Sequence, residues 1–253
     1  MWRVAAAANL RLVCHQRDNF AHDDFHRDLE HAERIIAVSQ SVFTSLPAAF
    51  QQRAAVVPNA VQMPERRRSS DRLRIGMAGR SIPEKGMHLF LDAVLPLMDR
   101  FDFDVTIWGL WSSDDRSVST SLVRRVRRLD KTLRSRIGLL RFRDDNEQFF
   151  GSTDIVVVPS LNPEPFGRMA MESMAWGCLT IVAGHGGLVE IVDDNVTGFV
   201  FQPGDAASLQ SKLEVALSDT ALCDEIRRAG REKAREKFSL DAHYQAVQRI
   251  YAP

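Results

Sequence analysis

Cysteine is scarce in this sequence, and its few occurrences form no recognisable pattern. The three cysteines are Cys14, Cys178 and Cys223, and no two of them form a CxxC pair. An odd, widely spaced set argues against a disulfide framework and against a zinc site built on cysteine pairs. We therefore expect buried or incidental thiols, a reducing compartment and a cytoplasmic location.

The sequence also lacks an excess of charge of one sign and any long hydrophobic run. Lys plus Arg and Asp plus Glu both number 33, so no overall positive charge indicates a nucleic-acid partner. Apolar runs such as residues 155–158 are far shorter than the roughly 20 residues of a membrane span. The first residues are only weakly apolar, so no signal peptide is expected.

Short apolar segments alternate with amphipathic ones along the 253 residues, of which 45% are hydrophobic and 26% charged. We expect a helix over residues 86–97 and strands at residues 34–39, 55–59, 73–79, 103–109, 137–142, 154–160, 179–184 and 198–201. This alternation predicts an α/β fold with a doubly wound parallel sheet. Ligands of such sheets lie at the carboxyl ends of the strands.

The chain is expected to divide into two Rossmann-like parts. Residues 66–71 are polar and follow Pro64, which makes them the best linker candidate. Residues 72–238 contain the elements of one complete doubly wound domain, and residues 1–65 contain part of another. Residues 239–253 contain a last helix, which is a candidate to pack back on the first part.

The segment from Gly79 to Gly86 has the outline of a diphosphate site. A strand ends in glycine, Arg80 and Lys85 follow five residues apart, and a helix then begins. Two cations and a helix N-terminus converge where an anion would lie. The alternative is a solvated loop with incidental charges, because the segment is neither a GxGxxG fingerprint nor a Walker loop.

A second segment, residues 163–177, places two glutamates after a buried strand. Glu164 lies in the loop before a helix that begins near Gly167, and Glu172 lies inside that helix, which Gly177 can end. A carboxylate at this edge of a sheet serves a ligand or caps a helix. Capping is the alternative for Glu164, and a buried ion pair is the alternative for Glu172.

Taken together, the segments GRSIPEKG and EPFGRMAMESMAWG resemble the nucleotide-sugar glycosyltransferases of family four, or group one, which have the two-Rossmann-domain GT-B fold. Four further segments agree with this family in the same order, namely residues 37–39, 57–61, 150–160 and 186–198. Each is weak alone, but their ordered occurrence is specific. The resemblance covers roughly residues 12–253 and implies a nucleotide-diphosphate-sugar donor with a sugar, lipid-linked or small-molecule acceptor.

The resemblance assigns the donor site residue by residue. Gly79 allows close approach of the backbone, and Arg80 and Lys85 would hold the diphosphate as fixed cations, with no metal. Glu164 is similar to the glutamate that contacts the donor sugar, and Glu172 to the glutamate that binds the ribose hydroxyls. The remaining donor-site assignments are the backbone amides of Phe166 and Gly167 for sugar and phosphate, and Arg143 beside the nucleobase.

The resemblance also implies transfer with retention of the anomeric configuration. The acceptor would attack from the face that the nucleotide leaves, with the β-phosphate as base and the two cations stabilising the developing charge. An acid–nucleophile pair of the glycosidase kind is rejected, because Glu172 is expected to point at the ribose. His15, at the end of a strand of the acceptor domain, falls near the donor sugar, with an ordinary loop histidine as the open alternative.

Several positions depart from the family pattern. Arg168 replaces an apolar residue and is a candidate contact of the acceptor or the sugar. His185, in a loop on the ligand side, is a candidate donor contact or an ordinary loop residue. Several strands that usually precede His15 have no counterpart, so we expect a truncated acceptor domain.

Two other patterns invite different interpretations. His22 and His26 are spaced for zinc on a helix, but no third ligand is evident. Residues 122–137 read as a basic helix with an apolar seam of Leu122, Val126, Leu129, Leu133 and Ile137. Its charges are most simply a solvated face, and contact with an anionic membrane surface is the alternative.

The sequence and its resemblance together favour a retaining, metal-independent glycosyltransferase without a cofactor. The first rival is a non-catalytic nucleotide-sugar-binding module, which would bind the donor but not transfer the sugar. The second is a nicotinamide-dependent dehydrogenase, which the absence of the glycine fingerprint disfavours.

Overall fold

Two parallel sheets form the computed structural model of this chain, which describes residues 12–18, 29–65, 72–141 and 145–252. The smaller sheet has the order β1-β2-β3, with β1 at Val13–Gln16, β2 at Arg34–Ala37 and β3 at Ala54–Val56. All of its described pairings are parallel. Helices α3 (Gln40–Ser45) and α4 (Ala48–Gln51) connect β2 to β3.

The larger sheet has the order β6-β5-β4-β7-β8-β9, again with parallel pairings. Its strands are β4 (Arg74–Ala78), β5 (Asp104–Leu110), β6 (Ile137–Arg141), β7 (Ile155–Val158), β8 (Leu179–Ala183) and β9 (Phe199–Phe201). The chain moves outward from β4 to β6 and then returns to the other side of β4. The switch therefore lies between β4 and β7, where a doubly wound sheet binds its ligand.

The larger sheet is covered on both faces, and its central strands are therefore buried. Every residue of β7 and β8 is buried, as the continuous apolar runs predicted. The connecting helices are α5 (Met87–Val94), α6 (Ser117–Arg127), α7 (Lys131–Ser135), α8 (Asn146–Gly151), α9 (Arg168–Ala175), α10 (Leu188–Ile191) and α11 (Ala206–Ser218). Phe90, Phe103, Phe150 and Phe199 are fully buried in the core between these layers.

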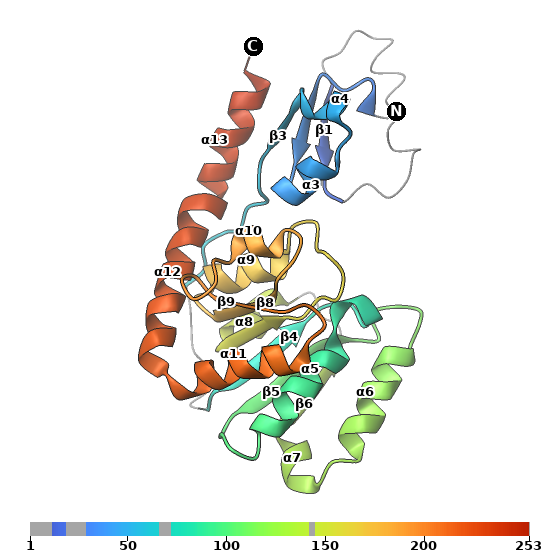
Figure 1. Cartoon of the computed structure of the whole chain (residues 1–253), viewed down its shortest axis with the longest axis vertical. Helices are drawn as coiled ribbons and strands as arrows, with labels where there is room; N and C mark the ends of the chain where they lie inside the picture. Colours follow the sequence, from blue (N-terminus) through green and yellow to red (C-terminus); the bar gives the residue numbers. More distant parts are fainter. Residues whose placement is uncertain (1–11, 19–28, 66–71, 142–144, 253) are drawn as a thin grey trace.

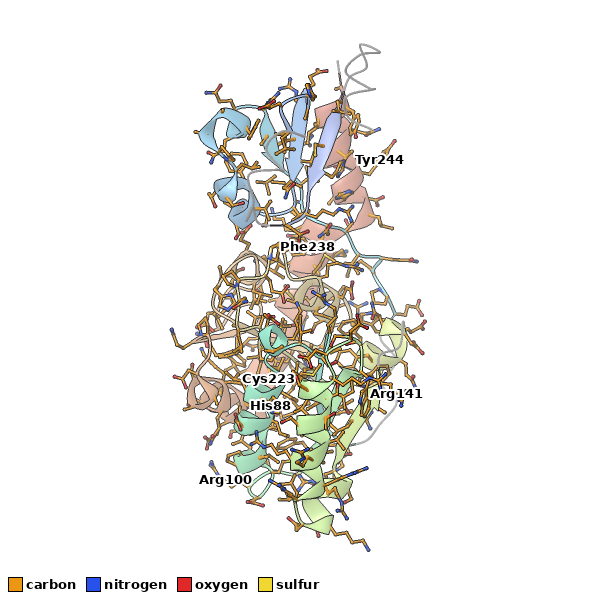
Figure 2. All side chains as sticks on the ribbon, turned by 90° about the vertical axis from the view of Figure 1, so that its right-hand side faces the viewer. His88, Arg100, Arg141, Cys223, Phe238 and Tyr244 are labelled. Carbon is orange, nitrogen blue, oxygen red and sulfur yellow. The ribbon has the colours of Figure 1, made fainter. Side chains whose placement is uncertain are left out.

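The last two helices join the two sheets. Helix α12 (Thr220–Phe238) packs along α9, and α13 (Leu240–Tyr251) continues beside the small sheet (Figure 1). At the junction the Val61 amide donates to the Phe238 carbonyl at 2.8 Å, and His243 Nδ1 lies 2.7 Å from the Pro58 carbonyl oxygen. Figure 2 shows Phe238 between the two parts and Tyr244 beside the small sheet.

The predicted α/β fold is confirmed, but two predicted helices are wrong in extent. The helix over residues 86–97 ends at Val94, and a 3-10 turn follows over Leu95–Leu97, because Pro96 has no amide proton to continue an α-helix. The single helix over residues 122–137 is also wrong, although the residues of its predicted apolar seam pack in or against the core. Helix α6 ends at Arg127, and the Asp130 carboxylate accepts from the Thr132 and Leu133 amides to start α7.

Candidate donor site

The glycine loop after β4 brings Lys85 to the exit of β7. Pro83–Lys85 form a 3-10 turn, and Gly86 ends it in the left-handed conformation with φ of 68°. A Cβ atom on Gly86 would lie 2.0 Å from the Pro159 carbonyl oxygen. Only glycine permits this close approach of the two chain segments, so the turn and the strand exit are held together at the switch point.

At that point Lys85 and Glu164 form an ion pair. Lys85 Nζ lies 2.5 Å from Glu164 Oε1, and the Ser160 hydroxyl donates to the same oxygen at 2.5 Å. The lysine side chain is 27% exposed and the glutamate 16%, so the pair faces the cleft rather than open solvent. The cation and the carboxylate are thus placed to bind an anion and a hydroxyl side by side.

Gly167 begins α9 beside this pair. Its φ is 103°, and a Cβ atom there would lie 2.5 Å from Leu188 Cδ2. Gly167 has no side chain that could cap α9, and the Ala170 amide donates to the Gly167 carbonyl, so the amides before Ala170 are left for a ligand. Phe166 is only 5% exposed and packs edge-to-face on Phe238 with ring centroids 6.0 Å apart, so its side chain is structural and its backbone faces the site.

Glu172 is buried one turn further along α9. It is 8% exposed, accepts from Arg168 Nη2 at 2.8 Å and accepts from Asn146 Nδ2 at 3.1 Å. Burial raises the pKa of this carboxyl above its usual value, although the nearby Arg168 guanidinium acts in the opposite direction. Glu172 is therefore an acceptor held in a fixed position at a cost in desolvation.

Among the described residues, the structure does not show the other predicted ones in hydrogen-bond contact with the Lys85–Glu164 pair. Arg80 is exposed, and no carboxylate of the described residues pairs with it. Gly79 lies between the end of β4 and Lys85, whose Cγ would be 3.6 Å from a Cβ there. His185 Nε2 lies 2.9 Å from the Ser160 carbonyl oxygen, with Nδ1 buried and unpartnered. Arg143, His22 and His26 lie outside the described residues.

A cleft of about 560 Å³ connects this site to the small sheet and α13. Its donor-side lining includes the predicted residues Lys85, Glu164, Phe166, Gly167 and Arg168. Another groove, of about 620 Å³, runs along β5 and β6 past Trp108 and has no lining residue in common with the cleft. These predicted donor-site residues line the cleft of about 560 Å³ and not the other groove, so this cleft is our candidate site.

The opposite wall of the cleft contains residues that the sequence analysis missed. They are Arg17, Asp18, Asn59 and His243. His15 lies near the end of β1 with its surface exposed, and the partial burial of its ring lowers its pKa, as do the nearby Arg17 and His243. Proximity of Arg17 to His15 in the sequence was the available signal for Arg17, whereas nothing local connects His243 to the site.

Comparison with known proteins decides the family. The model of the glycosyl transferases group 1 family matches residues 60–233, which include every described donor-side residue considered above. The chain belongs to the group 1 glycosyl transferases. An uncharacterized glycosyltransferase of Methanocaldococcus jannaschii is 30% identical over 173 residues, which are 68% of this chain and 42% of that protein.

Other relatives extend the comparison to the fold. The capsular polysaccharide biosynthesis glycosyltransferase CapM of Staphylococcus aureus is 24% identical over 72% of this chain and 46% of its own length. This group 1 chain thus spans less than half the length of either relative. The structure of Anabaena HepE in complex with UDP-glucose superimposes with a TM-score of 0.85 and 23% identity, covering 98% of this chain and 74% of HepE.

The described residues contain neither a candidate metal centre nor a membrane-spanning helix. Within these residues no three His, Cys, Asp or Glu side chains lie together as candidate metal ligands. None of the described helices combines the length and apolar character that crossing a bilayer requires.

Proposed function

We propose that this chain transfers a sugar from a nucleotide-diphosphate sugar to an acceptor hydroxyl, with retention of the anomeric configuration. The observation that carries the proposal is the Lys85–Glu164 pair, which lies beside the uncapped N-terminus of α9 at the switch point of the sheet. A diphosphate needs the cation and the amides, and a sugar hydroxyl needs the carboxylate. Both requirements are met within one cleft.

Each residue has a role in this proposal. Lys85, with Arg80 reaching in from the exposed loop, replaces a metal in binding the diphosphate and stabilises negative charge as it leaves. Glu164 orients the donor sugar, and Glu172 accepts from the ribose hydroxyls. The β-phosphate accepts the proton of the attacking hydroxyl, which enters from the same face. His15 lies on the acceptor side, and Arg168 contacts the acceptor or the sugar.

UDP is the first nucleotide to test. HepE, whose fold matches, has been crystallised with UDP-glucose. The most direct test is calorimetric titration of the chain, without divalent metal, with UDP, GDP and ADP and with their glucose or mannose conjugates. We expect one nucleotide series to bind.

Lys85→Ala should weaken that binding by roughly a hundredfold, because a buried charge-assisted contact to a diphosphate contributes about 3 kcal/mol. Lys131→Ala is the matched control, since Lys131 is an exposed lysine at the start of α7. Equal affinities of the two variants would contradict the assignment of the donor site. A melt monitored by circular dichroism confirms that both variants are folded.

Turnover separates catalysis from mere binding. A transferase releases nucleoside diphosphate from the bound donor when an acceptor is supplied, whereas a non-catalytic module binds the same donor and leaves it intact.

The exposed arginines of α6, including Arg124 and Arg127, make contact with an anionic membrane surface a further proposal. Sedimentation with anionic vesicles, compared with neutral ones, tests it.

A further inference from the structure

The wall of the cleft opposite Lys85 contains Arg17 and His243 together with Asp18 and Asn59, and the donor site does not need these groups. Arg17 and His243 line this wall, and His15 lies close enough for their charges to lower its pKa. Arg17 comes from the turn after β1, and His243 comes from α13, which is remote in the sequence. Two separate chain segments thus bring a guanidinium and an imidazole to one place.

The described structure holds two of these groups in place. Gln16 is 6% exposed, and its Nε2 donates to the Asp18 carbonyl at 2.6 Å, which pins the turn that carries Arg17. His243 Nδ1 lies 2.7 Å from the Pro58 carbonyl oxygen. A carbonyl only accepts, so Nδ1 carries a proton and Nε2 is the nitrogen left for a ligand; Nε2 donates to a phosphate oxygen when it is protonated as well.

Arg17 is not neutralised within the described part of the chain. No carboxylate there lies within ion-pair distance of its guanidinium, not even that of the adjacent Asp18. The cleft carboxylate Glu164 already accepts from Lys85 and Ser160, and Arg168 is paired with Glu172. Among the described residues the Arg17 guanidinium, which lies beside two imidazoles, has no counter-charge, and an anionic ligand supplies one.

We propose that the acceptor of this enzyme is a phosphorylated polyol or sugar, whose phosphate is bound by Arg17, His15 and His243 while Asp18 accepts from one of its hydroxyls. The proposal rests on the proposed function and adds the chemical class of the acceptor. The donor diphosphate lies against Lys85 on one wall, and the acceptor phosphate lies on the other. The reacting hydroxyl is thereby held between them.

Histidine-detected NMR tests this acceptor site directly. The chain is saturated with UDP, and sn-glycerol 3-phosphate is titrated while the imidazole signals of His15 and His243 are followed; glycerol is the uncharged comparison. We expect the phosphate ester, and not glycerol, to shift both signals. Vesicles of phosphatidylcholine with phosphatidic acid present the same group on a lipid, so shifts with vesicles alone identify a lipid headgroup as the source.

Variants of Arg17 test whether phosphate binds at this wall of the cleft. Arg17→Gln should weaken phosphate binding by about tenfold, which is the loss of one charge-assisted hydrogen bond, and Arg17→Lys should restore part of it. Arg100→Gln is the matched control, because Arg100 lies far from the cleft near the opposite end of the molecule (Figure 2).

Two results would overturn the acceptor proposal. One is the absence of any shift with either phosphate source in a protein that still binds UDP. The other is phosphate binding that UDP displaces and that Arg17→Gln leaves unchanged, since this would place the anion on Lys85. Failure to bind UDP is a different result, which contradicts the donor site instead.

Discussion

Glu172, which we propose binds the ribose hydroxyls, is buried at a cost in stability. Its carboxylate is buried and has only two described partners, Arg168 and Asn146, and burial raises its pKa. In the folded chain the group therefore binds a proton more readily than in the unfolded chain. Its contribution to stability is fully present below the unfolded pKa and is lost as pH rises through the folded pKa.

Glu172→Gln removes this penalty, so we expect the variant to melt at a higher temperature than the parent at pH 7. The gain should vanish as pH falls towards the unfolded pKa of Glu172, since both side chains are then neutral. Thermal melts across this pH range measure the effect. A lower melting temperature at pH 7 would mean that the ion pair with Arg168 outweighs desolvation. Donor affinity should fall in the same variant, because the glutamine amide has one accepting oxygen where the carboxylate has two, and its NH2 group cannot accept from a ribose hydroxyl.

At the scale of the element, the two glycines of the loop after β4, Gly79 and Gly86, differ in conformation and in the space around them. Gly86 has a positive φ and touches the Pro159 carbonyl, whereas Gly79 has ordinary space around its Cβ position. A side chain at Gly86 must therefore push the loop away from β7. A side chain at Gly79 need not move anything.

Gly86→Ala should lower the melting temperature by several degrees, since a left-handed alanine costs about 1–2 kcal/mol before the clash with Pro159 is added. Gly79→Ala is the matched control and should change it little. Calorimetric melts of both variants test this, and donor titration should show weaker binding for Gly86→Ala because Lys85 moves. Equal melting temperatures would show that the loop is free to relax.

Local signals made much of the donor site predictable. The ends of β4 and β7 were visible as apolar runs followed by glycine or proline, and parallel strands bring such ends to one edge. The family resemblance assigned both Lys85 and Glu164 to the donor site, and the two side chains are in contact. The α6–α7 break was missed although Asp130 offered a capping signal, because a continuous apolar seam was given more weight than the cap.

At the scale of the whole molecule, contacts of the α3 N-terminus connect the two parts. The Glu190 carboxylate on α10 accepts from the Gln40 and Ser41 amides at 2.6 and 2.7 Å. The Ser39 hydroxyl lies 2.5 Å from the Pro165 carbonyl oxygen. A negative group at the positive end of a helix stabilises it, so Glu190 both caps α3 and fastens the small sheet to the donor site.

Glu190→Gln should destabilise the chain by about 1 kcal/mol, or roughly 2–4 °C in melting temperature, because the amide loses the charge that the α3 amides favour. Glu225→Gln, at an exposed glutamate of α12, is the matched control. Differential scanning calorimetry compares the two variants. Indistinguishable melting temperatures would show that the Glu190 contact contributes nothing to the junction.

The sequence by itself determined the parallel sheet, the chain segments of the donor site and the family resemblance, because each depends on residues that are neighbours along the chain. Tertiary structure alone decided which remote groups meet. Glu190 reaches α3, and His243 reaches Pro58 and the cleft, only because α12 and α13 return past the donor site to the small sheet. Such contacts are set by packing between distant elements, for which neither periodicity nor spacing provides a signal.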